Sequence, residues 1–203
     1  EVLNKLNNEG IVTVEEGQSV ETTVEYKKGM EIDRGYISTH FVNDEKRVEA
    51  RFDEPYVLMT DKRIQFNFEL IPFLDRFLKE TQSRTLVIIA GEVIEEALAS
   101  LILNKLKGNI QVVAIQAPAY GARRSDELED IRALVGGVVI SNDSGRTIDS
   151  VKVEELGRAN KIIADRDKTI IINDTSSADV KARIAELKEQ LKIANTDYDK
   201  DIK

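Results

Sequence analysis

At residues 85–115 the chain reads TLVIIAGEVIEEALASLILNKLKGNIQVVAI, and this stretch decides its fold class. Residues 85–90 and 110–115 are short runs of aliphatic and β-branched side chains, which is typical of buried strands. Between them, from about residue 93 to 107, apolar residues recur at helical spacing. A strand, a helix and a strand in this order predict a βαβ unit with parallel strands, and therefore an α/β fold.

The sequence on the N-terminal side of this unit favours strands. Short β-branched or alternating stretches occupy residues 10–14, 20–26 and 54–60. A helix is predicted from about residue 68 to 80, because apolar residues there follow a helical period and Pro72 falls in the first turn, where a missing N–H is tolerated.

On the C-terminal side, a Pro- and Gly-containing loop precedes a predicted helix at 126–134 and a strand at 138–140. Residues 161–164 and 169–172 are apolar runs around a polar tetrapeptide, which predicts a β-hairpin. The chain then predicts a long amphipathic helix, whose apolar residues are spaced alternately by four and three: Val180, Ile184, Leu187, Leu191, Ala194 and Tyr198.

Composition narrows the class of protein. With 203 residues, of which 41% are apolar, the chain can bury one good-sized core. A net charge of −8 argues against nucleic acid as the main partner. Without cysteine, disulfides and thiolate metal sites are impossible, which fits a reducing compartment. No apolar run approaches the roughly 18 residues of a membrane span, and no signal peptide is recognisable, so a soluble intracellular protein is expected.

Side chains suited to catalysis are scarce. His40 is the only histidine, so neither a multi-histidine metal site nor a relay of two imidazoles can form. No phosphate-binding glycine loop joins a strand to a helix. The carboxylates at the start of the 126–134 helix are explained by the helix dipole and by solvation. We therefore assign no catalytic residue, no metal ligand and no cofactor to this chain.

The two central helices carry more apolar surface than one sheet can cover. In the first helix the apolar side chains of residues 70–78 spread over about 160° of arc, and the second is similarly broad. Two such helices placed side by side form either an exposed apolar groove or a fully buried part of the core. Periodicity alone leaves both readings open, and an exposed groove would indicate a binding site.

Three stretches resemble the group I chaperonins, the sixty-kilodalton GroEL-like class: GMEIDRGYIS at 29–38, EALASLILNKLKG at 96–108 and APAYGARR at 117–124. The resemblance covers most of the chain as an apical domain of β/β/α layers, with a βαβ unit, flanking helices and a long C-terminal helix. It implies that residues 1–26 lead from the intermediate domain and that residues 27–203 are the apical, polypeptide-binding domain. Since Glu1 is not an initiator methionine, we expect a fragment of a longer protein.

This resemblance also implies a binding site for non-native polypeptides and for the mobile loop of a GroES-like co-chaperonin. The matching residues come from an extended segment, a first helix and a second helix: Tyr36, Ser38, His40 and Phe41; Ile71, Leu74 and Asp75; Leu98, Ser100, Ile102, Leu103 and Asn104. The family commonly has tyrosine in place of His40, a basic residue in place of Phe68 and an acidic one in place of Ile94, so a more apolar rim is expected here.

For the full-length protein the resemblance implies a double-ring homo-oligomer that uses ATP and Mg²⁺ in a domain with no counterpart here. The fragment itself is expected to be a monomer without enzymatic activity, from a bacterial cytoplasm or from the matrix or stroma of a bacterial-derived organelle. Two alternatives follow from the residues. One is a small-molecule enzyme with a polar pocket at the carboxyl ends of the strands, near Ala90–Gly91 and Ile115–Gln116. The other is a purely structural assembly domain.

Overall fold

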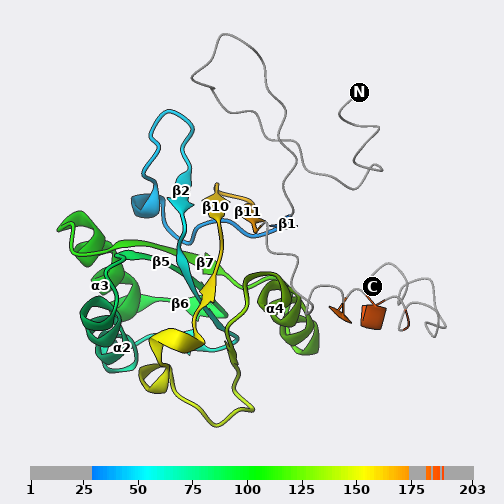
Figure 1. Ribbon diagram of the computed structural model, residues 1–203. Helices are drawn as coiled ribbons and strands as arrows, with labels where there is room; N and C mark the ends of the chain where they lie inside the picture. Colours follow the sequence, from blue (N-terminus) through cyan, green and yellow to red (C-terminus); the bar gives the residue numbers. More distant parts are fainter. Residues whose placement is uncertain (1–28, 174–181, 184, 188, 190–203) are drawn as a thin grey trace.

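The computed structural model describes residues 29–173 together with 182–183, 185–187 and 189, which form a mixed α/β domain (Figure 1). The strands predicted at 10–14 and 20–26 lie outside these residues, as does the leading segment 1–26. Of the predicted C-terminal helix, the described residues between 182 and 189 are helical. Arg183 ties them to the rest of the domain, because its Nε lies 2.6 Å from Oδ1 of Asp130.

One sheet is built on the predicted βαβ unit. Its strands lie in the order β7 (Gln111–Gln116), β5 (Thr85–Ala90), β3 (Tyr56–Thr60) and β8 (Val139–Ile140), and all neighbouring pairs are parallel. A short strand, β9 (Gly157–Arg158), pairs antiparallel with β3. Nearly every residue of β5 is buried, as expected of a strand covered on both faces. The parallel pairing of β5 with β7 confirms the central prediction.

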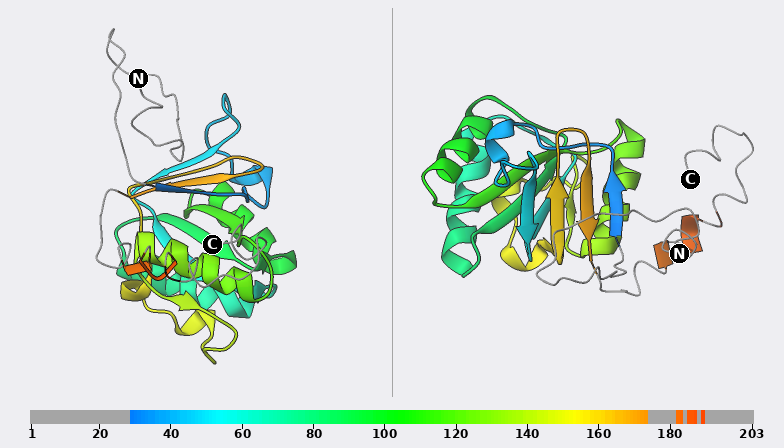
Figure 2. Two further views of the ribbon diagram at one scale, coloured as in Figure 1. Left: turned by 90° about the vertical axis from the view of Figure 1, so that its right-hand side faces the viewer. Right: turned by 90° about the horizontal axis from the view of Figure 1, so that it is seen from above.

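The second sheet is antiparallel. It contains β1 (Gly29–Ile32), β11 (Thr169–Ile172), β10 (Lys161–Ala164) and β2 (Ala50–Asp53), in that order. The β10–β11 pair confirms the predicted hairpin. In Figure 2 this sheet forms one layer, and helices occupy the opposite side of the domain.

Three helices follow the strands of the parallel sheet: α2 (Asn67–Glu80), α3 (Glu95–Leu106) and α4 (Ala122–Val135). The first two lie side by side, and α4 lies at the other side of the domain (Figure 1). Short 3₁₀ turns occur at η1 (Thr39–Phe41), η2 (Ile148–Ser150) and η3 (Val153–Glu155). The site segment expected to be extended therefore contains a helical turn at η1.

Two helix boundaries differ from the sequence prediction. Helix α3 begins two residues late because Glu92–Val93 forms strand β6, which pairs in parallel with β4 (Arg63–Ile64). Helix α4 begins four residues early, directly after Gly121, whose φ of 61° turns the chain into the helix. The prediction assigned Arg123 and Arg124 to the preceding loop, whereas they occupy the first turn of the helix.

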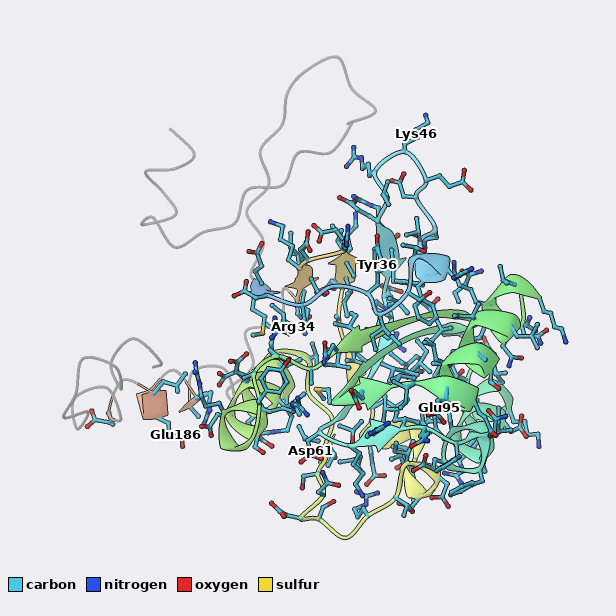
Figure 3. All side chains as sticks on the ribbon, turned by 180° about the vertical axis from the view of Figure 1, so that it is seen from behind. Arg34, Tyr36, Lys46, Asp61, Glu95 and Glu186 are labelled. Atoms are coloured by element: carbon cyan, nitrogen blue, oxygen red, sulfur yellow. The ribbon has the colours of Figure 1, made fainter. Side chains whose placement is uncertain are left out.

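A short segment joins the two sheets. The Tyr36 N–H donates to the carbonyl of Asp165 in the antiparallel sheet's hairpin at 3.0 Å, and the Ile37 N–H donates to the carbonyl of Ala114 in β7 at 2.8 Å. Arg34 and Tyr36 lie at this junction (Figure 3). Because successive amides of an extended chain point in opposite directions, two adjacent residues can bond to both layers.

Gly35 is the residue that lets this segment approach the hairpin. A Cβ atom at this position would lie 2.0 Å from the carbonyl oxygen of Asp165 and 2.4 Å from the carbonyl carbon of Arg166. Both are backbone atoms, which cannot rotate away as a side chain can. Thr169, fully buried, supports the same turn by donating its hydroxyl to the Arg34 carbonyl at 2.7 Å.

Gly35→Ala is therefore expected to destabilise the domain by about 3 kcal/mol or more, because the added methyl separates the two sheets. Urea unfolding followed by circular dichroism measures this loss. Gly108→Ala is the matched control: nothing lies within 4 Å of its Cβ position, so only the cost of its positive φ, about 1–2 kcal/mol, remains. Equal losses in the two variants would contradict the role given to Gly35.

Candidate functional site

Helices α2 and α3 are held side by side at their N-termini. Past the β4–β6 pair, the Ile94 N–H donates to the Ile64 carbonyl, and the Ala97 N–H donates to the Gln65 carbonyl, both at 3.0 Å. One turn further along, the Ser100 hydroxyl lies 2.6 Å from Oδ1 of Asn67. These bonds fix which stripe of each helix faces the other.

The exposure of α2 corrects one expected site residue. Leu74 was expected to line the groove, but it is only 4% exposed. It lies seven residues after Asn67, on the same stripe of the helix, and belongs to the hydrophobic core. Ile71 and Leu78 are half-buried, and Asp75 is exposed. The first helix therefore offers Ile71 and Asp75 at its surface, with Leu74 in the core.

Helix α3 presents different residues to its two neighbours. Ser100 bonds to α2, and residues three and four positions later, Leu103 and Asn104, follow it on that side. Leu103 is 51% exposed, whereas Ser100 and Asn104 are half-buried. Leu98 and Ile102, both half-buried, lie on the stripe that ends at Lys105.

Lys105 fastens this second stripe to the segment around η1. Its Nζ donates to the carbonyls of His40 at 2.7 Å and Val42 at 2.8 Å.

Burial lowers the pKa of the Lys105 ammonium below 10.5, so the folded state holds the proton less tightly than the unfolded state does. The stability contribution of this group therefore rises as the pH increases through the interval between the two values. Lys105 was not among the residues expected at the site, although helical spacing places it on the same stripe as Leu98 and Ile102.

In the extended segment, two expected site residues are core residues. Tyr36 is 7% exposed and Phe41 is fully buried, so their side chains anchor the segment and do not form a free surface. Ser38 is half-buried and His40 is exposed, with the Ser38 Oγ 3.1 Å from Nδ1 of His40. The segment crosses the edge of β7, where Tyr36 pairs with Ile115, and its large apolar side chains therefore pack into the core.

The structure thus divides the expected residues into three sets. The buried set is Tyr36, Phe41 and Leu74. The set on the side of α3 that faces α2, which we name the α2–α3 surface, is Ile71, Asp75, Ser100, Leu103 and Asn104. The set on the side that faces η1, the α3–η1 surface, is Ser38, His40, Leu98 and Ile102.

The place expected for a small-molecule pocket is closely packed at the strand ends. Ala90 and Ile115 are fully buried, and a Cβ on Gly91 would lie 2.1 Å from the Asp61 carbonyl oxygen. A cleft of about 410 Å³ lies instead beyond the end of β7, between β1 and the start of α4. Its lining includes Arg34, Tyr120, Arg123 and Glu127.

Charges of both signs meet in this cleft. Burial raises the pKa of the Glu127 carboxyl, and the charge of Arg123 opposes that rise. Tyr120 is exposed, with the Arg34 guanidinium 6.0 Å and the Arg124 guanidinium 5.3 Å from its ring centre. These contacts are typical of a solvated surface cleft that a cation–π cluster stabilises.

Neither a metal-binding cluster nor a membrane-spanning helix is present in the described part of the chain. Within residues 29–173 and the six described residues that follow, no group of three His, Asp or Glu side chains is placed to hold a metal ion. No helix among the described residues is both long and apolar enough to cross a membrane. No protein-family model matches the sequence.

Lys105→Met is expected to loosen the segment around η1, because it removes two charge-assisted hydrogen bonds to backbone carbonyls. Amide hydrogen exchange of residues 39–42 should become faster by about tenfold or more. Lys107→Met is the control, since Lys107 is exposed on the same end of α3. Unchanged exchange in Lys105→Met would show that the two bonds do not hold the segment.

Proposed function

We propose that this domain is the apical domain of a GroEL-like chaperonin and that it binds non-native polypeptides and the mobile loop of a GroES-like co-chaperonin. The observation that carries the proposal is the exposure of apolar side chains on both sides of α3 and on the neighbouring α2. Leu103 is 51% exposed, and Ile71, Leu98 and Ile102 are each only partly covered by the core. Exposed apolar groups gathered on rigid helices are typical of sites that bind other chains.

The polar side chains on α3 are already hydrogen-bonded within the domain. The apolar residues alternate with Ser100 and Asn104, whose polar groups are already bonded within the domain: Asn104 Nδ2 donates to the Ser100 carbonyl at 2.9 Å. A bound segment therefore meets methyl and methylene groups without having to satisfy many new polar partners. Such a surface selects for apolarity and not for one sequence, which suits unfolded clients.

The free energy available from burying these side chains favours weak binding by a single domain. Full burial of a leucine-sized side chain contributes about 1.5–3 kcal/mol, and these side chains are already partly buried, so each adds about half of that. Ordering the bound segment opposes the gain. A ring that presents several such surfaces raises the effective concentration and strengthens the overall binding.

In this proposal the domain performs recognition alone. A separate ATP-binding domain of the full-length ring would move it, and the co-chaperonin loop would compete with the client for the same side chains. The layered arrangement of the two sheets and the helices supports the apical-domain assignment, together with the three motifs at 29–38, 96–108 and 117–124. A bacterial cytoplasm or an organelle of bacterial origin is the compartment that goes with it.

Calorimetry with a short apolar peptide tests the proposal. The unmodified chain is expected to bind it with micromolar affinity, and Leu103→Glu to weaken binding at least tenfold, because a carboxylate would be placed against apolar groups. Since Leu103 is half exposed, this variant should fold. Val138→Glu is the matched control, because Val138 is 38% exposed and lies beyond the C-terminal end of α4.

Equal binding by the Leu103→Glu and Val138→Glu variants would show that the peptide does not bind at α3. Absence of binding by the unmodified chain would overturn the proposed function and leave the enzyme and assembly alternatives. Calorimetric binding of small polar molecules would then favour the enzyme alternative. Self-association in analytical ultracentrifugation would favour the assembly alternative.

A further inference from the structure

Two phenylalanine rings stand at the surface where α2 begins. Phe66 is 41% exposed and Phe68 is 73% exposed. Their ring centres are 5.5 Å apart, and the ring planes differ by 12°, so they are stacked. An exposed aromatic pair adds little to the core and keeps apolar surface in water, which indicates a role in binding.

The backbone beneath this pair is firmly held. The carboxylate of Glu69 accepts hydrogen bonds from the N–H groups of Gln65 at 3.0 Å and Phe66 at 2.9 Å. The Gln65 side chain donates to Oε2 of Glu95 at 2.7 Å. The aromatic pair is therefore positioned next to the first turn of α3, where Glu95 and Glu96 are both exposed (Figure 3 labels Glu95).

The surroundings favour a positively charged partner. The face of an aromatic ring carries partial negative charge and attracts ammonium and guanidinium groups. Among the described residues, arginines lie over the rings of Tyr56 and Tyr120, but no cation is placed over Phe66 or Phe68. Exposed carboxylates stand beside the pair, and the chain as a whole carries a net charge of −8.

The pair also continues the α2–α3 surface. Ile71 follows Phe68 by three residues, so the two lie on neighbouring positions of the same side of α2. A segment that covers Ile71 and Leu103 can thus extend over the Phe68 ring.

We propose that Phe66, Phe68 and Glu95 form a subsite that binds a lysine or arginine next to the apolar residues of a bound polypeptide. This inference rests on the proposed function, which it narrows: the preferred client segments are apolar stretches flanked by a basic residue. The stacked rings supply the cation-binding face, and the carboxylate adds charge complementarity.

The test uses three peptides with the same apolar stretch, flanked at one position by Lys, Gln or Glu, titrated into the full chain at a fixed ionic strength. The Lys peptide is expected to bind about fivefold more tightly than the Gln peptide, and the Glu peptide more weakly than both. In the Phe66→Leu/Phe68→Leu variant the Lys-to-Gln ratio should fall below about twofold, since leucine keeps an apolar side chain without a ring face. Phe68→Tyr should keep the preference.

The outcomes separate this subsite from the proposed function. Equal binding of all three peptides, still weakened at least tenfold by Leu103→Glu, overturns the subsite and leaves the proposed function standing. A Lys preference that survives in the double leucine variant but is lost in Glu95→Gln also overturns it, because the carboxylate would then act without the rings. Failure of every peptide to bind overturns the proposed function and the subsite together.

Discussion

The two adjacent hydrogen bonds made by Tyr36 and Ile37 are the constraint on which the remaining arrangement depends. One N–H reaches the hairpin of the antiparallel sheet and the next reaches β7 of the parallel sheet, so a single peptide step joins the layers. Gly35 makes the approach possible, and the buried rings of Tyr36 and Phe41 anchor the segment that follows it. From that anchor the segment continues to η1, where Lys105 of α3 holds its carbonyls.

This linkage places three elements of the candidate site in a fixed order, with α3 between α2 and the η1 segment. Hydrogen bonds define both contacts: Ser100 to Asn67 on one side, and Lys105 to His40 and Val42 on the other. The apolar side chains of α3 that these two contacts leave uncovered form the exposed apolar surface. A rigid frame under a chemically simple surface suits the recognition of many different unfolded segments, because adaptation can come from the bound chain.

The sequence alone predicted the elements whose pattern is local. Strands β5 and β7 were recognisable from their β-branched runs, and helices α2 and α3 from the helical spacing of their apolar residues. Both kinds of element produce a characteristic pattern of apolar residues in the sequence. The short β4–β6 pair was not predictable, since two-residue strands carry no period. Burial of Leu74 and Tyr36 was also beyond reach, because it depends on which neighbour covers each side chain. Lys105 shows the same limit: its partners are backbone carbonyls more than sixty residues away.

The most direct test of the central claim is a nuclear magnetic resonance titration of the isotopically labelled chain with a short apolar peptide, following every backbone amide. Binding at the helices predicts that the shifted signals gather on Ile71, Ser100, Ile102 and Leu103, with smaller changes in residues 38–42. Shifts confined to the cleft around Tyr120 and Glu127, or no shifts at all, would contradict it.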